Sequence, residues 1–213
     1  MVRYLNMSGE YGNWWAVGFS ILLFLYFIKS AFKPRTKVDW ASYHYMEAFV
    51  VALFAEMYGF PLTIYLLTTY FGNKLNLDFT HNGGHLLNTL LGTEGDPHFS
   101  GLHIVSGVLI VVGLSLLNRG WKTLYKATRK GVLAREGVYQ YVRHPQYMGF
   151  VLLIVGFLLE WPTLITVLMA PILIWRYTRL SLDEEREMEE KFGQEYRKYT
   201  ATTPRYLPKL PSL

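Results

Sequence analysis

The chain has 213 residues, and its composition and charge already exclude several classes of protein. Half of the residues are hydrophobic (51%) and only 17% are charged, against about a quarter in an ordinary soluble domain, which excludes a disordered chain. The chain has no cysteine, so disulfides, thiolate zinc sites and cysteine nucleophiles are excluded. The net charge is +5, but the positive charges lie between long apolar runs, which favours a membrane over a nucleic acid as the partner.

Five apolar runs follow one another along the chain, at residues 14–32, 46–71, 101–117, 147–161 and 163–175. A helix needs roughly 20 apolar residues to cross a bilayer core, so the first three runs are predicted to be transmembrane helices. The last two are shorter, and we expect them to form a tight helical hairpin in a thinned or partly protein-filled region. The predicted fold is therefore an all-α integral membrane bundle of about five transmembrane helices, with a cytosolic C-terminal helical cap.

The lysines and arginines are distributed unevenly over the loops. Four lie in residues 29–37, seven in 118–146 and eight from 176 onward, which accounts for 19 of the 21. With five crossings these three segments lie on the same side, and cytoplasmic loops are enriched in lysine and arginine. The sequence therefore predicts a multi-pass membrane protein whose N-terminus is outside and whose C-terminus is cytoplasmic.

Two segments on the predicted cytoplasmic side carry reactive groups, and the first is Arg143, His144 and Pro145, just before the fourth apolar run. Proline fits the first turn of a helix, where its missing N–H is harmless. The free amides of a helix start, helped by an arginine, can hold an anion or a carboxylate. Such a site can bind a charged cofactor beside the lipid that holds an apolar substrate. The alternative is that Arg143 and His144 only anchor the helix at the membrane interface.

The second segment is the acidic run at residues 183–190 in the C-terminal tail. Glu184 and Glu185 lie at the border of an apolar stripe, from which a carboxylate can reach a ribose hydroxyl or an ammonium group near the membrane surface. A solvated helix face is the alternative. The stripe is formed by four side chains at helical spacing: Met188, Phe192, Tyr196 and Tyr199.

Together these residues resemble the isoprenylcysteine carboxyl methyltransferase family, whose wider group includes bacterial phospholipid N-methyltransferases. The resemblance covers about the last 90 residues. It implies a helical membrane protein whose C-terminal half encloses S-adenosylmethionine under a cytosolic cap, with a lateral opening for a lipophilic methyl acceptor. The motif residues are Gly137, Tyr139, Arg143, His144, Pro145, Tyr147 and Gly149, then Glu184, Glu185, Phe192, Gly193, Glu195, Tyr196 and Tyr199.

Carried over to this sequence, the resemblance implies a cofactor pocket and two catalytic residues. Arg143 would hold an anionic acceptor and Glu185 would order the site. Residues 101–213 would form this methyltransferase core, while residues 1–100, which show no comparable match, are predicted to hold helices and an outer loop that determine the substrate. The implied cofactor-binding residues are Val132, Gly137, Tyr139, His144, Pro145, Tyr147 and Glu184.

The implied cofactor is S-adenosylmethionine, and the implied partners are membrane lipids and a lipophilic small molecule or lipid substrate. Whether the accepting group is a carboxylate, an amine or a thiol stays open, as does the oligomeric state. Two other functions also stay open. One is an NADPH-dependent oxidoreductase like the sterol reductases, whose C-terminal arrangement is similar. The other is a non-enzymatic transporter or metal-handling protein.

Two polar features are not part of the implied site. Four histidines within 23 positions, His81, His85, His98 and His103, could form a metal site, but their spacing matches no zinc pattern and we assign no metal ligand. A hydrogen-bonded loop with a buried His103 is the simpler expectation. Glu56 interrupts the second apolar run, and because ionisable groups inside a bilayer usually face a partner, we expect it to pair with His103.

Overall fold

The computed structural model describes residues 11–75, 80–93 and 95–208, and these residues form helices and connecting loops without a strand. The predicted all-α class is confirmed. The long axis is formed by α1 (Trp14–Phe32), α2 (Lys37–Phe54), α5 (Gly101–Lys130), α6 (Pro145–Glu160) and α7 (Leu164–Phe192). The shorter helices are α3 (Leu62–Leu75), α4 (Leu86–Leu90) and α8 (Gln194–Thr202), with single turns η1 (Ala55–Gly59), η2 (Asn82–Gly84), η3 (Pro97–Phe99) and η4 (Gly137–Gln140).

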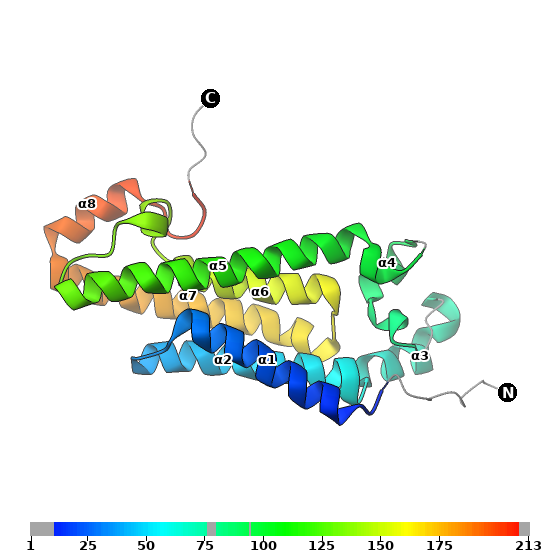
Figure 1. Ribbon diagram of the computed structural model, residues 1–213. Helices are drawn as coiled ribbons and strands as arrows, with labels where there is room; N and C mark the ends of the chain where they lie inside the picture. The colour runs from blue at the N-terminus through cyan, green and yellow to red at the C-terminus, as the bar shows by residue number, and fades with distance from the viewer. Residues whose placement is uncertain (1–10, 76–79, 94, 209–213) are drawn as a thin grey trace.

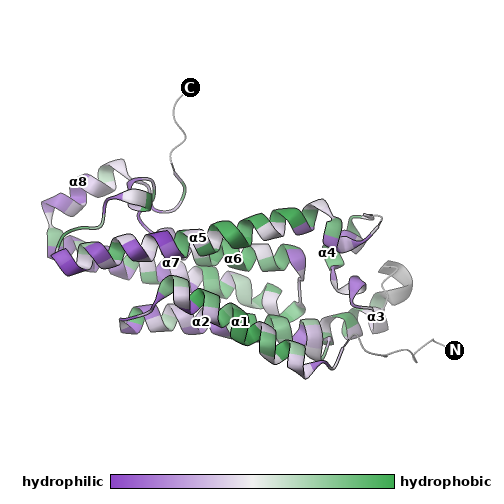
Figure 2. Ribbon diagram, viewed as in Figure 1, coloured by the Kyte–Doolittle hydropathy of each residue, from purple (hydrophilic) through white to green (hydrophobic). Residues whose placement is uncertain are grey.

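The long helices lie side by side, with α3 and α4 at one end of the bundle and α8 at the other (Figure 1). Hydrophobic residues line their middle parts, and hydrophilic residues gather around α8 and the ends of α5 and α7 (Figure 2). Among the described residues, α1, α5 and α7 are each long and apolar enough to cross a membrane, and α2 with α3 makes a fourth span if the bent pair counts as one. The apolar helix α6 is shorter, at 16 residues. The chain is a multi-pass helical membrane bundle.

The second apolar run is not one helix, contrary to the prediction for residues 46–71. The chain leaves α2 through the π-helical turn η1 and bends by 60° before α3. Pro61 has no N–H to continue the helical ladder, which explains the break. The buried carboxylate of Glu56 bridges it, since its Oε2 accepts a hydrogen bond from the backbone N–H of Thr63 at 2.8 Å.

The expected pairing of Glu56 with His103 is wrong. His103 lies in the first turn of α5, and its Nδ1 is 2.7 Å from Oε1 of Glu160 at the end of α6. The histidine predicted to be buried is also a different one: His85 is buried, whereas the His103 side chain is partly exposed. The break after α2 explains the first difference, because the Glu56 carboxylate is occupied by the backbone N–H of Thr63 at the start of α3.

The C-terminal hairpin is also longer than predicted. A capping box of Thr163 and Thr166 starts α7, and the helix then continues for 29 residues, through the end of the apolar run and the whole acidic run. Glutamate, arginine, leucine and methionine all favour helix, so the backbone stays helical where hydropathy falls. The helix ends at Gly193, whose φ of +50° turns the chain, so the expected stripe is divided between α7 and α8.

Glycines bring α5 and α6 into close contact. A Cβ atom on Gly113 would lie 2.8 Å from the carbonyl oxygen of Gly149, and a Cβ atom on Gly149 would lie 2.9 Å from the carbonyl oxygen of Gly113. Small residues at a helix interface allow such close approach in membranes. The start of α6 is therefore held firmly against α5, which fixes the position of His144.

Candidate active site

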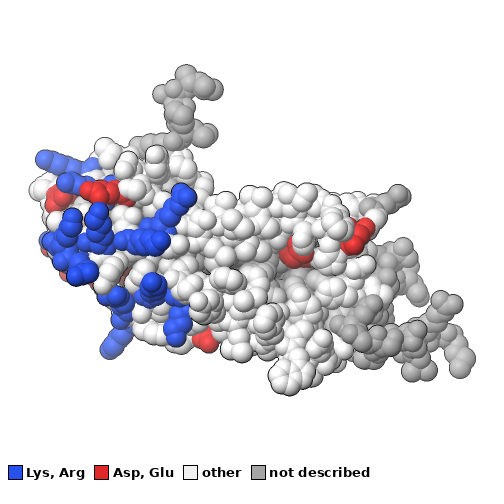
Figure 3. Space-filling view, viewed as in Figure 1, with Lys and Arg blue, Asp and Glu red and all other residues white. Residues whose placement is uncertain are grey.

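One end of the molecule is strongly basic. Lysine and arginine side chains gather at the end of the bundle that carries α8, and the middle of the displayed face is free of them (Figure 3). The three basic segments identified in the sequence thus meet in space. The candidate active-site residues lie at this same end, on α6, α7 and the segment after α8.

The residues around His144 place it at the N-terminal end of α6. Pro145 occupies the first helical position and His144 precedes it as the N-terminal cap residue. The backbone N–H groups of Arg143 and His144 donate hydrogen bonds to the carbonyl oxygens of Pro204 and Arg205, at 2.9 and 3.1 Å. The segment after α8 therefore pairs with the segment before α6, and the imidazole of His144 is buried between them.

Glu185 is the centre of a compact ionic cluster. Its Oε1 is 3.0 Å from Nε2 of His144 and 3.3 Å from Nη2 of Arg143. Arg205 binds the same carboxylate through two N–H groups, with Nε donating to Oε1 at 2.9 Å and Nη2 donating to Oε2 at 2.7 Å. The side chain of Glu185 is only 13% exposed, so these contacts are shielded from solvent. Paired arginine and carboxylate groups with this geometry make strong, directional contacts.

Glu184 completes the cluster on its more open side. It accepts a hydrogen bond from the hydroxyl of Tyr147 at 2.6 Å, and its Oε2 is 3.5 Å from Nδ1 of His144. Its side chain is 36% exposed, which leaves part of this carboxylate available to a ligand. His144 thus lies between two carboxylates, one on each side of the ring.

The two glutamates control the protonation of His144. Burial by itself lowers the pKa of the imidazole, but hydrogen bonds to Glu184 and Glu185 and the charges of both carboxylates outweigh it, so the pKa of His144 is raised above its ordinary 6.5. The two carboxylates therefore stabilise the protonated form of the ring. Each ring nitrogen faces one of these carboxylates, so neither nitrogen is placed to accept a proton from a substrate.

A second layer of contacts holds the cap over the cluster. The hydroxyl of the buried Tyr139, in η4, donates to Oε1 of Gln146 at 2.7 Å, and Tyr199 of α8 donates to the carbonyl oxygen of Tyr139 at 2.6 Å. Gly137 begins η4 with a φ of +59°, a conformation that other residues adopt only under strain. These contacts confirm a helical cap that packs on the segment before α6.

Two of the predicted cofactor residues, Val132 and Gly137, make none of the cluster contacts described above. Val132 lies at the far end of its segment with a half-exposed side chain, and its N–H donates to the carbonyl oxygen of Ala127, which closes α5. A hollow of about 440 Å³ lies on the outer side of η4, and of the predicted cofactor residues only Gly137 lines it. The other lining residues are Arg119, Lys122, Thr123, Val138, Gln140 and Tyr141.

The structure thus joins five of the predicted residues in one network and adds one that the sequence did not assign. Arg205 contributes the two shortest contacts between an arginine and Glu185, yet it had no predicted role. The available signal was a single arginine in a proline-bounded segment, at residues 204–208, beyond the last helix. The joined residues are Arg143, His144, Tyr147, Glu184 and Glu185.

Part of this sequence is similar to known proteins. Residues 99–190 match the model of the isoprenylcysteine carboxyl methyltransferase (ICMT) family. The protein-S-isoprenylcysteine O-methyltransferase of Schizosaccharomyces pombe is 28% identical over 87 residues, which are 40% of this chain and 37% of that protein. The protein-S-isoprenylcysteine O-methyltransferase B of Arabidopsis thaliana is 29% identical over 108 residues, which are 49% of this chain and 55% of that protein.

The chain therefore matches about half or less of the length of these curated relatives. The matched family segment runs from η3 to the acidic part of α7 and contains both glutamates of the cluster. The resemblance predicted from the sequence is confirmed: over residues 99–190 this chain matches the isoprenylcysteine carboxyl methyltransferase family.

Proposed function

We propose that this protein is a membrane-embedded, S-adenosylmethionine-dependent methyltransferase that methylates the carboxylate of a lipophilic molecule of the S-isoprenylcysteine type. The observation that carries the proposal is the ionic cluster of the buried His144 with Glu185, Arg143 and Arg205 at the N-terminal end of the apolar helix α6. The match to the ICMT family and the names of both relatives support it.

The chemistry of the cluster fits the cofactor. S-adenosylmethionine carries an ammonium group, a carboxylate and ribose hydroxyls, and the partly exposed Glu184 suits the ammonium group or a hydroxyl. Arg143 suits an anion, because its Nε atom is buried and finds no hydrogen-bond partner in the described part of the chain. Buried polar atoms normally have partners, so this one is explained if a bound carboxylate accepts from it. The arginine and carboxylate groups thus cover both signs of charge on the cofactor.

The protonation of His144 favours a carboxylate acceptor. When bound, S-adenosylmethionine supplies a methyl group on a positively charged sulfur that is already activated. A carboxylate can accept this methyl without losing a proton, whereas an amine or a thiol needs a base. Both ring nitrogens of His144 face a glutamate, and its raised pKa favours the protonated form, so His144 is poorly placed to act as that base. The side chains are then needed to align the two substrates and exclude water, which is sufficient for methyl transfer.

We further propose that the basic end faces the cytoplasm, with the N-terminus on the opposite side. The convergence of the lysines and arginines at the end that carries α8 supports this orientation, since cytoplasmic segments are enriched in these residues (Figure 3). The cofactor site then opens toward the compartment that holds S-adenosylmethionine.

Binding of S-adenosylmethionine to the purified full chain tests the cofactor assignment. We expect His144→Ala and Glu185→Gln each to weaken binding by more than about tenfold, because hydrogen bonds to charged groups contribute about 1.5–3 kcal/mol. Isothermal titration calorimetry measures the affinity directly. Asp183→Asn is the matched control, since Asp183 lies on the same helix, is exposed and pairs only locally with Arg186.

The contrary result is equally clear. Unchanged affinity in both site variants would show that the cluster does not hold the cofactor. Thermal protection of the wild-type protein by NADPH, without protection by S-adenosylhomocysteine, would instead indicate a reductase.

A pair of acceptors tests the proposed substrate class. The enzyme should methylate an S-isoprenylcysteine derivative with a free carboxylate, and it should leave the matching carboxamide unmodified. Transfer of the radiolabelled methyl group from S-adenosylmethionine is the measurement. Transfer to an amine phospholipid in place of the carboxylate would refute the acceptor proposal while retaining the methyltransferase.

A further inference from the structure

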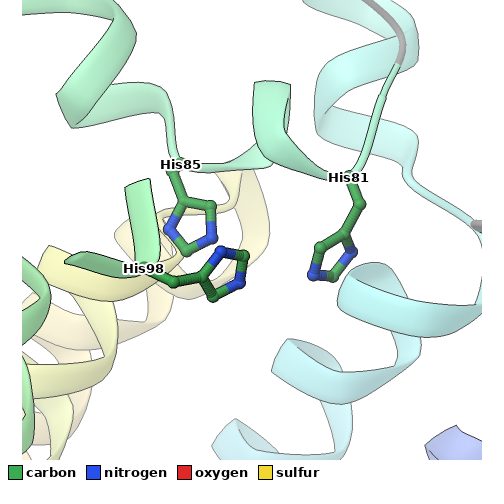
Figure 4. A group of neighbouring side chains, drawn as sticks. All are labelled: His81, His85 and His98. Atoms are coloured by element: carbon green, nitrogen blue, oxygen red, sulfur yellow. The ribbon is translucent and has the colours of Figure 1, made fainter. Parts of the chain in front are cut away.

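Three histidines converge at the end of the molecule opposite to the basic end. His81 precedes η2, His85 follows it, and His98 lies in η3 (Figure 4). One ring nitrogen from each of them lies within 4.8 Å of the other two. The rings of His85 and His98 lie next to each other, with His81 facing them (Figure 4). The methyltransferase site uses none of these residues.

A carboxylate orients the ring of His98, and the ring of His85 lies near a second carboxylate that also contacts His103. Nδ1 of His98 is 2.8 Å from Oδ1 of Asp96, and Nδ1 of His85 is 3.6 Å from Oε1 of Glu160. A carboxylate at Nδ1 leaves Nε2 as the nitrogen with a free lone pair. Histidines that bind metals are commonly held in this way, with the second ring nitrogen facing a carboxylate.

The nitrogen of His85 that such an arrangement leaves free has no hydrogen-bond partner among the residues that the structure describes. His85 is only 3% exposed, and its Nε2 is buried without a hydrogen bond. A buried polar atom without a partner is unusual, and a metal ion would satisfy it. The side chain of His98, by contrast, is 40% exposed, so an ion can enter from solvent.

Packing holds the histidines in place. Gly84 lies directly against the indole of Trp161, and a Cβ atom there would overlap this ring. The same indole contacts the rings of His81 and His85, with centroid separations of 4.6 and 5.0 Å. The two glycines between His81 and His85 therefore allow the short turn η2 to place both rings against Trp161.

We propose that His81, His85 and His98 form a binding site for a divalent transition-metal ion, with Zn²⁺ as the fitting species. Imidazole nitrogens suit zinc, copper and nickel, and three histidines with one open position make a common zinc arrangement. Zinc–nitrogen bonds of about 2.0–2.1 Å bring tetrahedral ligand atoms to about 3.4 Å from each other, so the rings close in on the ion by small rotations.

Zinc binding to the full-length, tag-free protein tests the proposal. We expect the wild-type chain to bind one Zn²⁺ per molecule in calorimetry, and His85→Ala and His98→Ala each to lose this stoichiometric binding. Cobalt substitution should give the visible absorption of a tetrahedral site in the wild-type protein only. His44→Ala is the matched control, because His44 is exposed on α2 and pairs with Glu47.

A milder variant keeps the test valid if an alanine variant fails to fold. Asp96→Asn leaves all three ligands in place and should weaken zinc affinity by about 10–100-fold, as expected for a carboxylate behind a ligand. Retained binding of S-adenosylhomocysteine or an unchanged melting temperature shows that each variant is folded. The proposal is refuted if the folded wild-type protein binds no zinc, or if folded His85→Ala binds it as tightly as the wild type.

Discussion

Glu185 receives three cationic side chains from segments that are distant in sequence. His144 and Arg143 precede α6, whereas Arg205 follows α8, and all three meet one carboxylate. Desolvation of a carboxylate is costly unless its partners compensate for it, so removing one partner weakens the whole cluster.

Substitution of Arg205 tests this dependence. Arg205→Gln removes the two-point contact with Glu185, and we expect the affinity for S-adenosylmethionine to fall by roughly tenfold or more, given about 1.5–3 kcal/mol for a charged hydrogen bond. Arg186→Gln, which removes an exposed arginine on α7, is the control and should bind normally. Equal affinities of the two variants would show that Arg205 does not support the site.

The raised pKa of His144 predicts a pH dependence of stability. Because its folded pKa lies above 6.5, its ion pairs contribute fully below pH 6.5, and this contribution is lost as the pH rises through the raised value. The difference in melting temperature between the wild-type protein and His144→Gln should therefore be largest in acid and shrink toward alkaline pH. A difference that stays constant with pH would exclude a charged His144.

The sequence predicted the local part of this site and missed the distant part. Arg143, His144 and Tyr147 stand within one short segment, and Glu184 and Glu185 are adjacent, so each half is visible as a motif. Arg205 reaches the cluster only because Gly193 turns the chain and α8 returns it to the start of α6. A contact that depends on such a return leaves no periodic signal in the sequence.

At the level of helices, the packing of α5 on α6 positions the N-terminal end of α6, where His144 lies. The backbones of Gly113 and Gly149 approach each other without side chains between them. Gly149 stands in the family-like motif, and its contacts show a packing role.

Gly149→Ala should therefore destabilise the protein by about 1–3 kcal/mol, the usual cost of overpacking, since the new methyl group meets the carbonyl oxygen of Gly113. Thermal unfolding in detergent measures the effect. Gly107→Ala is the control on α5, because a Cβ atom there meets nothing within 4 Å. A wild-type melting temperature for Gly149→Ala would contradict the tight interface.

Hydropathy predicted a helix correctly where the apolar run and the helical backbone begin and end at the same residues. The run at residues 14–32 coincides with α1. Hydropathy did not predict the break within residues 46–71 or the full length of α7. The reason is that hydropathy reports the surroundings of a residue and not its backbone conformation. Residues 46–71 stay apolar across the bend at Pro61, while α7 stays helical long after its residues become polar.

Over the whole molecule, the two ends have different chemistry. Basic and acidic residues of the candidate active site gather at the end with α8, and three histidines gather at the other. If the long helices cross the bilayer, these ends face different compartments.

Cysteine labelling checks this orientation, because the natural chain has no cysteine to interfere. A membrane-impermeant maleimide applied to intact cells should label Asn82→Cys and leave Gln140→Cys unlabelled until the membrane is opened. Both positions are exposed and lie in single helical turns at opposite ends, which makes them a matched pair. The reverse labelling pattern would invert the proposed topology.

The pairing of residues 143–144 with residues 204–205 has a practical consequence for anyone who handles the protein. Proteolytic clipping near Thr203 would remove one wall of the candidate active site and leave every long helix intact. Circular dichroism and gel filtration would then still indicate a folded, helical protein, although the protein would be inactive. The intact mass of a variant should therefore be measured before its weak activity is attributed to the substitution.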